Sequence, residues 1–271
     1  MAIITKITTQ KKNQDRFNVF MDYGKGEEYA FSVDSEVLIK FQLKKGMELD
    51  DLSYLEVQYQ DDIRKAYNLA IHYLARRMRS EKEIRDYLVQ KEKEEPVINE
   101  VIHKLLSHKY INDEEYALSY VRTQINASDK GPDVIRMELK ERGINELASQ
   151  MALAQFPLEL QIEKATKIYE KSFQKNARDS QRIIHQKAEN LLLRKGYPFD
   201  IINIAVQEAE MDKDIDEEME AIKYQGEKAH RKFSGYTGYE YEQKMKQTLF
   251  RKGFSMELIE KFIEDVKNHD D

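Results

Sequence analysis

A segment of twenty residues that occurs twice constrains the fold more than any other feature of this chain. Residues 187–206 have the sequence KAENLLLRKGYPFDIINIAV, and residues 244–263 have the sequence KMKQTLFRKGFSMELIEKFI. When Gly196 is aligned with Gly253, two basic residues precede each glycine and an aromatic residue follows it. Glycine can adopt the left-handed conformation that ends a helix, and basic side chains suit the negative end of the helix dipole. Each copy therefore predicts a helix, a glycine turn and a second helix.

Two fainter copies lie upstream. Residues 134–153 place Gly143 at the glycine position, and residues 83–102 place Glu92 there. Four copies, spaced about 50–57 residues apart, form a tandem repeat that is too long for one two-helix unit and suits three helices per unit. We therefore predict a mainly α protein, in which tandem three-helix repeats form an extended curved array.

The first sixty residues have a different pattern. Three segments alternate apolar and polar side chains and are rich in β-branched and aromatic types, which is typical of strands. These segments are residues 3–8, 16–22 and 28–33. Residues 35–43 fit a short helix, and residues 55–59 fit one more strand. We predict a small β-rich head that packs against the first helix of the array, because so few strands cannot hold a large core alone.

Capping patterns and turns divide the rest of the chain. Ser80 and Glu83 fit a capping box, and Pro132 fits the first position of a helix. The predicted domains are the β head over residues 1–60 and four helical repeats over residues 61–112, 113–160, 161–213 and 214–271.

Composition argues against several classes of protein. The chain has no cysteine, which excludes a disulfide framework and a cysteine-ligated metal. It lacks an apolar signal segment and any run of about 18 apolar residues, so we expect a cytoplasmic protein without membrane contact. The net charge of −6 argues against a protein whose affinity rests mainly on phosphate contacts.

The patterns of catalytic sites are also missing. The six histidines include no pair spaced by four residues, the spacing typical of a helical metal site. Gly24, Lys25 and Gly26 lack the glycine spacing and the Ser or Thr of a phosphate-binding loop. No serine lies in a nucleophile-elbow pattern. We therefore expect a protein that is not an enzyme, with no catalytic residue, no metal and no cofactor.

The order of several motifs resembles the RecX family of regulators of the RecA recombinase, in its longer form with an extra C-terminal helical unit. The motifs are RRMRS at residues 76–80, EIR at 83–85, KYINDEEYA at 109–117, GP at 131–132 and IR at 135–136. The likeness covers nearly the whole chain and is weakest in the head. Glu92 departs from the expected helix-ending glycine, which affects only the local cap.

The resemblance implies a non-enzymatic protein that acts in DNA recombination, DNA repair and the SOS response. Family members bind the RecA–DNA filament, lie along its groove and modulate, usually by inhibition, its ATP hydrolysis and strand exchange. Some members also contact DNA, so weak binding of single-stranded DNA is a further expectation. We expect the chain to act as a monomer.

Basic residues near the repeat joints are the candidate contacts with such a filament. Guanidinium groups bind carboxylates and phosphates bidentately, but the same side chains can simply compensate helix dipoles. The sequence leaves both interpretations open. The candidates are Arg76, Arg77, Arg79, Lys82, Arg85, Arg136, Lys140, Arg142, Arg194 and Lys195.

Two other functions compete with the filament regulator. Three-helix units resemble helix-turn-helix modules, so the chain could bind DNA directly through a row of Arg, Asn and Gln side chains. Residues 96–106, which would form such a helix, are mostly apolar or acidic instead. A helical-repeat scaffold for another protein is the third candidate, and without the resemblance the sequence does not separate it from the first.

Overall fold

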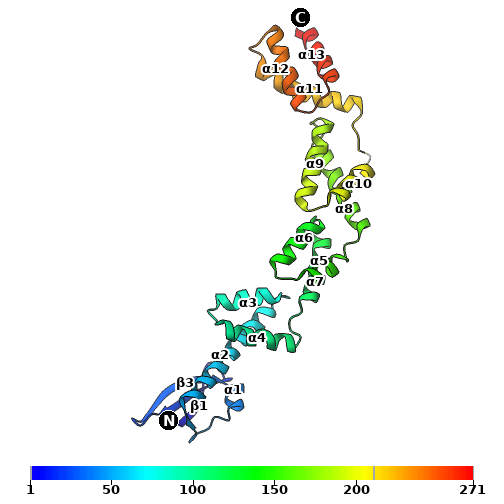
Figure 1. Cartoon of the computed structure of the whole chain (residues 1–271). Coiled ribbons are helices and arrows are strands. Elements are labelled where there is room, and N and C mark those ends of the chain that lie inside the picture. Colours follow the sequence, from blue (N-terminus) through cyan, green and yellow to red (C-terminus); the bar gives the residue numbers. More distant parts are fainter. Residues whose placement is uncertain (1, 210, 271) are drawn as a thin grey trace. The chain divides into compact units, whose positions relative to one another are not determined.

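The computed structural model describes residues 2–209 and 211–270, with side chains described as far as residue 266 (Figure 1). The chain divides into two compact units. One contains residues 1–116 and 141–145, and the other contains residues 117–140 and 146–271. The prediction of a mainly α protein with three-helix repeats and a small β head is confirmed.

The head is a four-stranded antiparallel sheet in the order β3-β2-β1-β4. Its strands are β1 (Ala2–Thr9), β2 (Arg16–Asp22), β3 (Glu27–Asp34) and β4 (Glu48–Leu49). The inward side chains alternate along each strand and form a core with α1 (Ser35–Lys40) and α2 (Asp51–Leu74). Val37 of α1 and Val57 of α2 are buried in this core, so both helices cover one face of the sheet.

The predicted strand at residues 55–59 is wrong, because this segment is part of α2. The carboxylate of Asp50 caps that helix by accepting the backbone N–H of Ser53. Within five residues, alternate apolar side chains fit a strand as well as a helix. Over a longer window, Tyr54, Val57 and Asp61 repeat with helical spacing and face the head or the buried side of α2. The helical period therefore decides the local structure, and α2 continues past residue 60 into the first repeat.

The first repeat packs α3 (Glu81–Gln90) and α4 (Glu95–Ser107) against the second half of α2. Ser80 forms the predicted capping box with Glu83, since each side chain accepts the backbone N–H of the other residue. The buried core of this repeat contains Ile63, Ala66, Ala70, Ile84, Leu88, Val97, Ile98, Val101, Ile102, Leu105 and Ile111.

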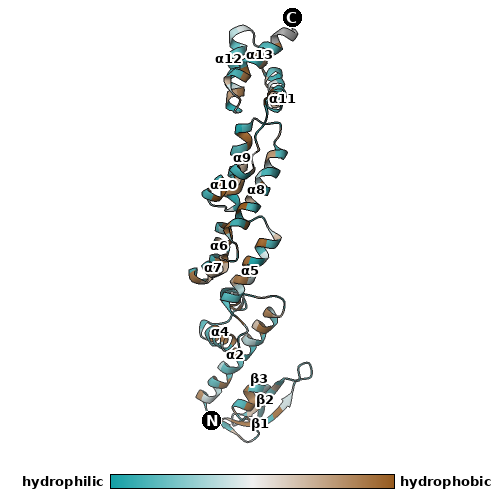
Figure 2. Ribbon diagram, turned by 90° about the vertical axis from the view of Figure 1, so that its right-hand side faces the viewer, coloured by the Kyte–Doolittle hydropathy of each residue, from teal (hydrophilic) through white to brown (hydrophobic). Residues whose placement is uncertain are grey.

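The remaining helices follow in groups of three. The second repeat contains α5 (Asp113–Ala127), α6 (Pro132–Glu141) and α7 (Glu146–Leu153). The third contains α8 (Leu158–Lys175), α9 (Gln181–Lys195) and α10 (Phe199–Ala209), and the fourth contains α11 (Ile215–Phe233), α12 (Gly238–Arg251) and α13 (Met256–Asp270). Figure 2 shows that these helices carry both hydrophilic and hydrophobic residues, as amphipathic packing requires.

The glycine turns form as predicted. Gly143, Gly196 and Gly253 have φ angles of 81°, 84° and 87°. After Gly196, the backbone N–H of Tyr197 donates to the carbonyl of Leu192 at 3.1 Å, which is the bond of a Schellman motif. Glu92 adopts the same left-handed conformation, with a φ of 55°, so the first repeat keeps this turn without glycine.

An equivalent hydrogen bond links successive repeats at three places. Each time, a donor just before the middle helix of one repeat binds a carbonyl at the C-terminal end of the middle helix of the next repeat. Ser80 Oγ donates to the carbonyl of Arg142 at 2.7 Å within the first unit. Within the second unit, the N–H of Gly131 donates to the carbonyl of Lys195 at 2.7 Å, and Ser180 Oγ donates to the carbonyl of Lys252. Each contact supplies a partner to a carbonyl at a helix C-terminus, which has none inside its own helix.

Candidate anion-binding groove

A groove lined mainly by basic side chains lies between α8 and α9 in the second unit. Its volume is about 560 Å³. Lys171 and Lys175 line it from α8, and Lys187, Arg194 and Lys195 line it from α9. The groove thus includes two of the residues predicted from the sequence, Arg194 and Lys195, and brings them together with three lysines.

Helical spacing explains why these cations gather. Lys171 and Lys175 are four residues apart, so they lie one turn apart on the same face of α8. Ile168 and Ser172, on the adjoining part of α8, are nearly buried against the rest of the repeat and also line the groove. Packing of α8 on α9 therefore forms the groove, and the five cations are among its lining residues.

Two of the five cations have carboxylate partners. Lys187 forms an ion pair with Asp179, and Lys195 lies 3.3 Å from Asp129. Asp129 is the one carboxylate among the lining residues of the groove. These two pairs orient their lysines but leave the groove with a net positive charge.

The other three cations lack carboxylate partners in the described part of the chain. Lys171 and Lys175 are exposed and make no hydrogen bond or ion pair with the described residues. Arg194 is exposed and donates Nε to the carbonyl of Asn190 at 3.3 Å, while its terminal nitrogens make no hydrogen bond with the described residues. Such groups attract phosphates or clustered carboxylates, and the guanidinium can bind either one bidentately.

The basic cluster of the first repeat has a different character. Arg77 lies 2.6 Å from Glu83, and Arg79 lies 3.4 Å from the same carboxylate oxygen. Arg85 lies 2.8 Å from Glu81. These pairs favour the structural interpretation of the three arginines, and contact with a partner stays a prediction for them.

Arg76 and Lys82 complete that cluster. Arg76 is exposed and makes no hydrogen bond or ion pair with the described residues. Lys82 Nζ donates to the carbonyl of Glu141 at 2.8 Å, again near the end of a middle helix. Of the five predicted residues in this cluster, Arg76 is therefore the one whose charge is most available.

The basic residues predicted as contacts in the second repeat also differ in whether their charge is paired. Arg136 lies 2.8 Å from Asp133 on its own helix. Lys140 is exposed and has no hydrogen bond or ion pair to the described residues. Arg142 takes part in the joint through its carbonyl, which accepts the hydroxyl of Ser80.

The sequence-based search missed Lys171, Lys175 and Lys187. The sequence reasoning considered basic residues beside the glycine turns and capping motifs, whereas Lys171 and Lys175 lie at the C-terminal end of α8 and Lys187 lies inside α9. A helical-wheel pattern was available, because Lys171 and Lys175 follow Ile168 at helical intervals of three and seven residues. The pattern does not say which second helix supplies the opposite wall.

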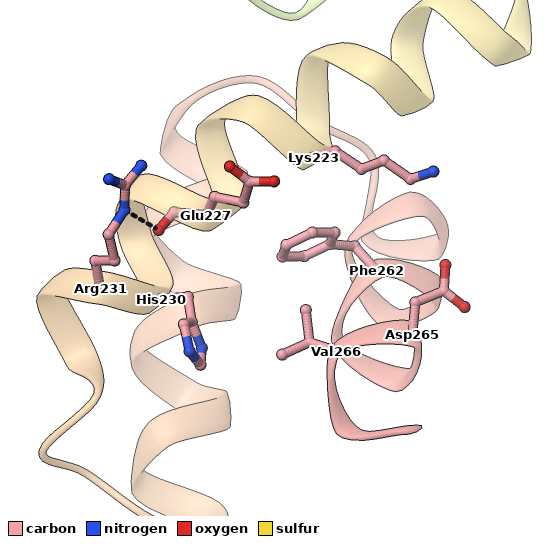
Figure 3. A pocket seen from close by; sticks show the side chains of 7 residues that line it. All are labelled: Lys223, Glu227, His230, Arg231, Phe262, Asp265 and Val266. Atoms are coloured by element: carbon pink, nitrogen blue, oxygen red, sulfur yellow. Dashed lines mark hydrogen bonds between the residues drawn. The ribbon is translucent and has the colours of Figure 1, made fainter. Parts of the chain in front are cut away.

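A second hollow of about 430 Å³ lies between α11 and α13 (Figure 3). Phe262 and Val266 form its apolar part, and the ring of Phe262 packs directly on α11 because residue 226 is glycine. Lys223 and Arg231 are balanced by Glu227 and Asp265 around it. This hollow has no excess charge of either sign, unlike the groove in the third repeat.

No group of three or more His, Asp or Glu side chains among the described residues is placed to hold a metal ion. No described helix combines the length and apolar character needed to cross a membrane.

Comparisons with known proteins match almost the whole chain. The model of the regulatory protein RecX N-terminal domain matches residues 2–50, and those of the first and second RecX three-helix domains match residues 66–105 and 112–153. The model of the third domain matches twice, at residues 159–206 and 216–263. This double match agrees with the internal likeness of the last two repeats.

Full-length relatives and solved structures give the same result. The chain is 49% identical to regulatory protein RecX of Bacillus velezensis and 47% identical to that of Bacillus subtilis, over 98% of this chain and 99% of each relative. A crystal structure of regulatory protein RecX matches with 36% identity and a TM-score of 0.68, over 76% of this chain and 100% of that one. RecX from Lactobacillus salivarius matches with 41% identity and a TM-score of 0.53, over 55% of this chain and 97% of that one.

Proposed function

This chain belongs to the RecX family of regulatory proteins, and we propose that it binds the RecA–DNA filament and inhibits the activity of the recombinase. Family membership supports the regulatory role. The observation that carries the binding mode is the groove between α8 and α9, where Lys171, Lys175 and Arg194 have no carboxylate partner among the described residues. A nucleoprotein filament offers both phosphates and carboxylates to such a groove.

The proposed mechanism is non-covalent and needs no cofactor. Contacts that are weak singly add up when several repeats bind one polymer, because each bound repeat raises the effective concentration of the next. A regulator attached in this way can slow the subunit changes that ATP turnover requires, or block the entry of a second DNA. We place this activity in the cytoplasm and assign the chain no catalytic role.

Titration of the ATPase activity of RecA on single-stranded DNA tests this proposal. We expect the rate to fall as the protein is added and to reach a plateau at saturation. An unchanged rate at saturating protein would reject the regulatory role. Filaments assembled before and after addition of the protein separate slowed turnover from blocked growth.

Direct binding to DNA is the second candidate, because the same five cations also suit a bare phosphate backbone. It predicts that the protein binds naked duplex at physiological salt, with an affinity that falls steeply as salt rises. The filament proposal predicts instead that the filament is bound more tightly than the DNA it contains. Measuring both affinities in one buffer decides between them.

A further inference from the structure

The fourth repeat carries a cation at every position that corresponds to a cation of the groove. Gly253 lies 57 residues after Gly196, and Ile215, which begins α11, lies 57 residues after Leu158, which begins α8. Each residue of the third repeat therefore aligns with the residue 57 positions later. The residues aligned with the five groove cations are Lys228, Lys232, Lys244, Arg251 and Lys252.

This retention is selective. The helices α8 to α10 and their loops contain four further lysines and arginines, and none of these four lines the groove. If surface cations were kept without regard to their position, both sets would be retained alike. The groove cations are retained instead and the other four are replaced, by Ala221, Tyr224, Gly235 and Tyr239.

The two helices α11 and α12 bring these cations together. Lys228 and Lys232 lie one turn apart on α11, as their counterparts do on α8. Lys252, which follows the last residue of α12, donates Nζ to the side-chain oxygen of Gln225 at 2.8 Å. Because Gln225 lies about one turn before Lys228, the end of α12 packs beside the lysine-bearing flank of α11. We call the five aligned cations the α11–α12 face.

Most of the charge on the α11–α12 face is available to a partner. Lys228, Lys232 and Arg251 are exposed and have no carboxylate partner among the described residues. Lys228 Nζ lies 4.0 Å from the centre of the Tyr224 ring, which does not neutralise it. Lys244 lies 3.5 Å from Glu240, and this carboxylate is the one that forms an ion pair with the face in the described part of the chain.

Acidic side chains of α11 lie away from this face. Glu227 lines the hollow beside Phe262, on the flank of the helix that faces α13 (Figure 3). Glu218 accepts a backbone N–H from the third repeat. Glu217 and Glu220 line a separate hollow together with residues of the third repeat. The α11–α12 face therefore has a basic excess, although the fourth repeat as a whole is acidic.

We propose that the α11–α12 face is a second site for the anionic partner of the groove, so that the chain holds this partner at two equivalent points. This inference rests on the proposed function. Because the two sites share their cations, they suit the same anionic group. A filament repeats each surface group from subunit to subunit, whereas a free subunit presents each group once. The duplicated site therefore makes the chain selective for assembled RecA, through the effective concentration of the second contact.

The test compares two dissociation constants of the full chain. One is for RecA filaments on single-stranded DNA, and the other is for free RecA kept below the concentration at which it assembles. The variant Lys228→Glu/Lys232→Glu/Arg251→Glu reverses the three unpaired cations of the face. We expect it to bind the filament about tenfold or more weakly than the wild type, and free RecA within about twofold of the wild type, because one subunit occupies one site at a time.

The matched control is Lys223→Glu/Arg231→Glu/Lys261→Glu, which makes the same change in net charge at exposed cations of the same repeat outside the face. It should keep both wild-type affinities. Equal weakening of filament binding in the control and the face variant would overturn the second site, because net charge would then account for the effect.

Two further outcomes separate this inference from the function on which it rests. A face variant that binds the filament like the wild type would contradict the second site, as would one that loses affinity for the filament and for free RecA to the same extent. A wild-type chain that binds no filament would reject the proposed function itself, and the second site with it.

Lysine footprinting of the unmodified protein covers the case in which the face variant fails to fold. Acetylation of the chain, alone and bound to the filament, followed by mass spectrometry, reports how reactive each lysine is. We expect the filament to protect Lys228 and Lys232 together with Lys171 and Lys175, while Lys223 stays reactive. Protection confined to the lysines of the third repeat would contradict the proposal.

Discussion

Tyr197 and Phe254 occupy the same place after their helix-ending glycines, but only the tyrosine carries a hydroxyl. Tyr197 is 1% exposed, and its hydroxyl has no hydrogen-bond partner among the described residues. Burial, with a smaller effect from the charge of Asp129, raises the pKa of Tyr197 to about 12. The hydroxyl is therefore neutral at physiological pH. On folding it loses its hydrogen bonds to water and gains none with the described residues.

We predict that Tyr197→Phe increases the free energy of unfolding by about 1 kcal/mol, because it removes an unpaired buried polar group. Urea denaturation followed by far-UV circular dichroism measures the change. Tyr169→Phe is the matched control, since the Tyr169 hydroxyl pairs with His185 Nδ1 and its removal should destabilise the protein. A loss of stability in Tyr197→Phe would show that its hydroxyl has a partner.

Asp61 is the buried charge that holds the head to α2. Its side chain is 0% exposed and lies 2.8 Å from Arg16 and 2.9 Å from Lys65. Its Oδ1 also accepts the backbone N–H of Asp34 at 2.8 Å. Burial by itself raises the pKa of the Asp61 carboxyl, but hydrogen bonds from Arg16 and Lys65 outweigh it and hold the pKa below its usual 3.8.

A lowered folded-state pKa fixes the direction of the pH dependence. The Asp61 carboxylate stabilises the fold fully above the unfolded-state pKa of about 3.9, and this stabilisation is lost as pH falls through the folded-state pKa. Asp61→Asn should lower the free energy of unfolding at pH 7 by about 3 kcal/mol and flatten its dependence on pH below 5. Denaturation curves between pH 3 and 7 measure both effects.

Asp62→Asn provides the comparison, because Asp62 is half exposed and, among the described residues, forms an ion pair with Lys65 alone at the surface. It should change the free energy of unfolding by less than about 1 kcal/mol. If Asp61→Asn and Asp62→Asn lowered the free energy of unfolding equally at pH 7, the buried ion pair between Asp61 and Arg16 would not be what holds the head to α2.

Single residues also show where sequence reasoning ends. The capping box of Ser80 and the left-handed glycines follow local rules and were predictable from their neighbours alone. The pairing of Arg77 and Arg79 with Glu83 was not, because a basic run looks the same whether its charges are neutralised or free. Side-chain direction decides that question, and tertiary packing sets the direction.

At the scale of elements, the contact between α6 and α9 depends on glycine for space. A Cβ atom on Gly131 would lie 2.4 Å from the backbone carbon of Gly196 and 2.6 Å from the nitrogen of Tyr197. Both contacts are with backbone, which cannot swing aside as a side chain can. The N–H of Gly131 also donates to the carbonyl of Lys195, so displacement would break that bond.

We predict that Gly131→Ala lowers the free energy of unfolding by about 1–3 kcal/mol through overpacking. Gly235→Ala is the control, because no atom lies within 4 Å of the Cβ it would gain and neither glycine needs a positive φ. Thermal denaturation of the two variants beside the wild type gives the comparison. Equal stability of Gly131→Ala and the wild type would show that these helices are not in close contact.

The elements themselves were largely predictable, except that the two-residue strand β4 was not expected and the strand expected at residues 55–59 is helical. Long amphipathic helices carry enough turns for the period of 3.6 residues to be recognised. Residues 55–59 are too few to separate that period from the alternation of a strand, and the neighbouring strands of the head made a further strand plausible. The cap at Asp50 was the local signal that this segment is helical.

At the scale of the whole molecule, the repeat is evident from the sequence but the groove is not. The glycine turns and their spacing reveal the repeat, and the spacing predicts three helices in each repeat. The groove forms where Lys171 and Lys175 of α8 meet Lys187, Arg194 and Lys195 of α9. No linear motif joins these five residues, so only the packed helices reveal the cluster.

Substitution of the unpaired cations tests whether the groove binds the filament. The triple variant Lys171→Glu/Lys175→Glu/Arg194→Glu reverses three charges that have no carboxylate partner among the described residues. The control Lys44→Glu/Lys45→Glu/Lys261→Glu makes the same change in net charge at exposed lysines outside the groove. Both sets of positions are on the surface, so both variants should fold.

The most direct test of filament binding is the dissociation constant of each variant for RecA filaments assembled on single-stranded DNA, measured by co-sedimentation at physiological salt. We predict that the groove variant binds about tenfold or more weakly than the wild type, while the control variant keeps the wild-type affinity. Equal affinities of the two variants for the filament would contradict the assignment of the groove as its contact surface.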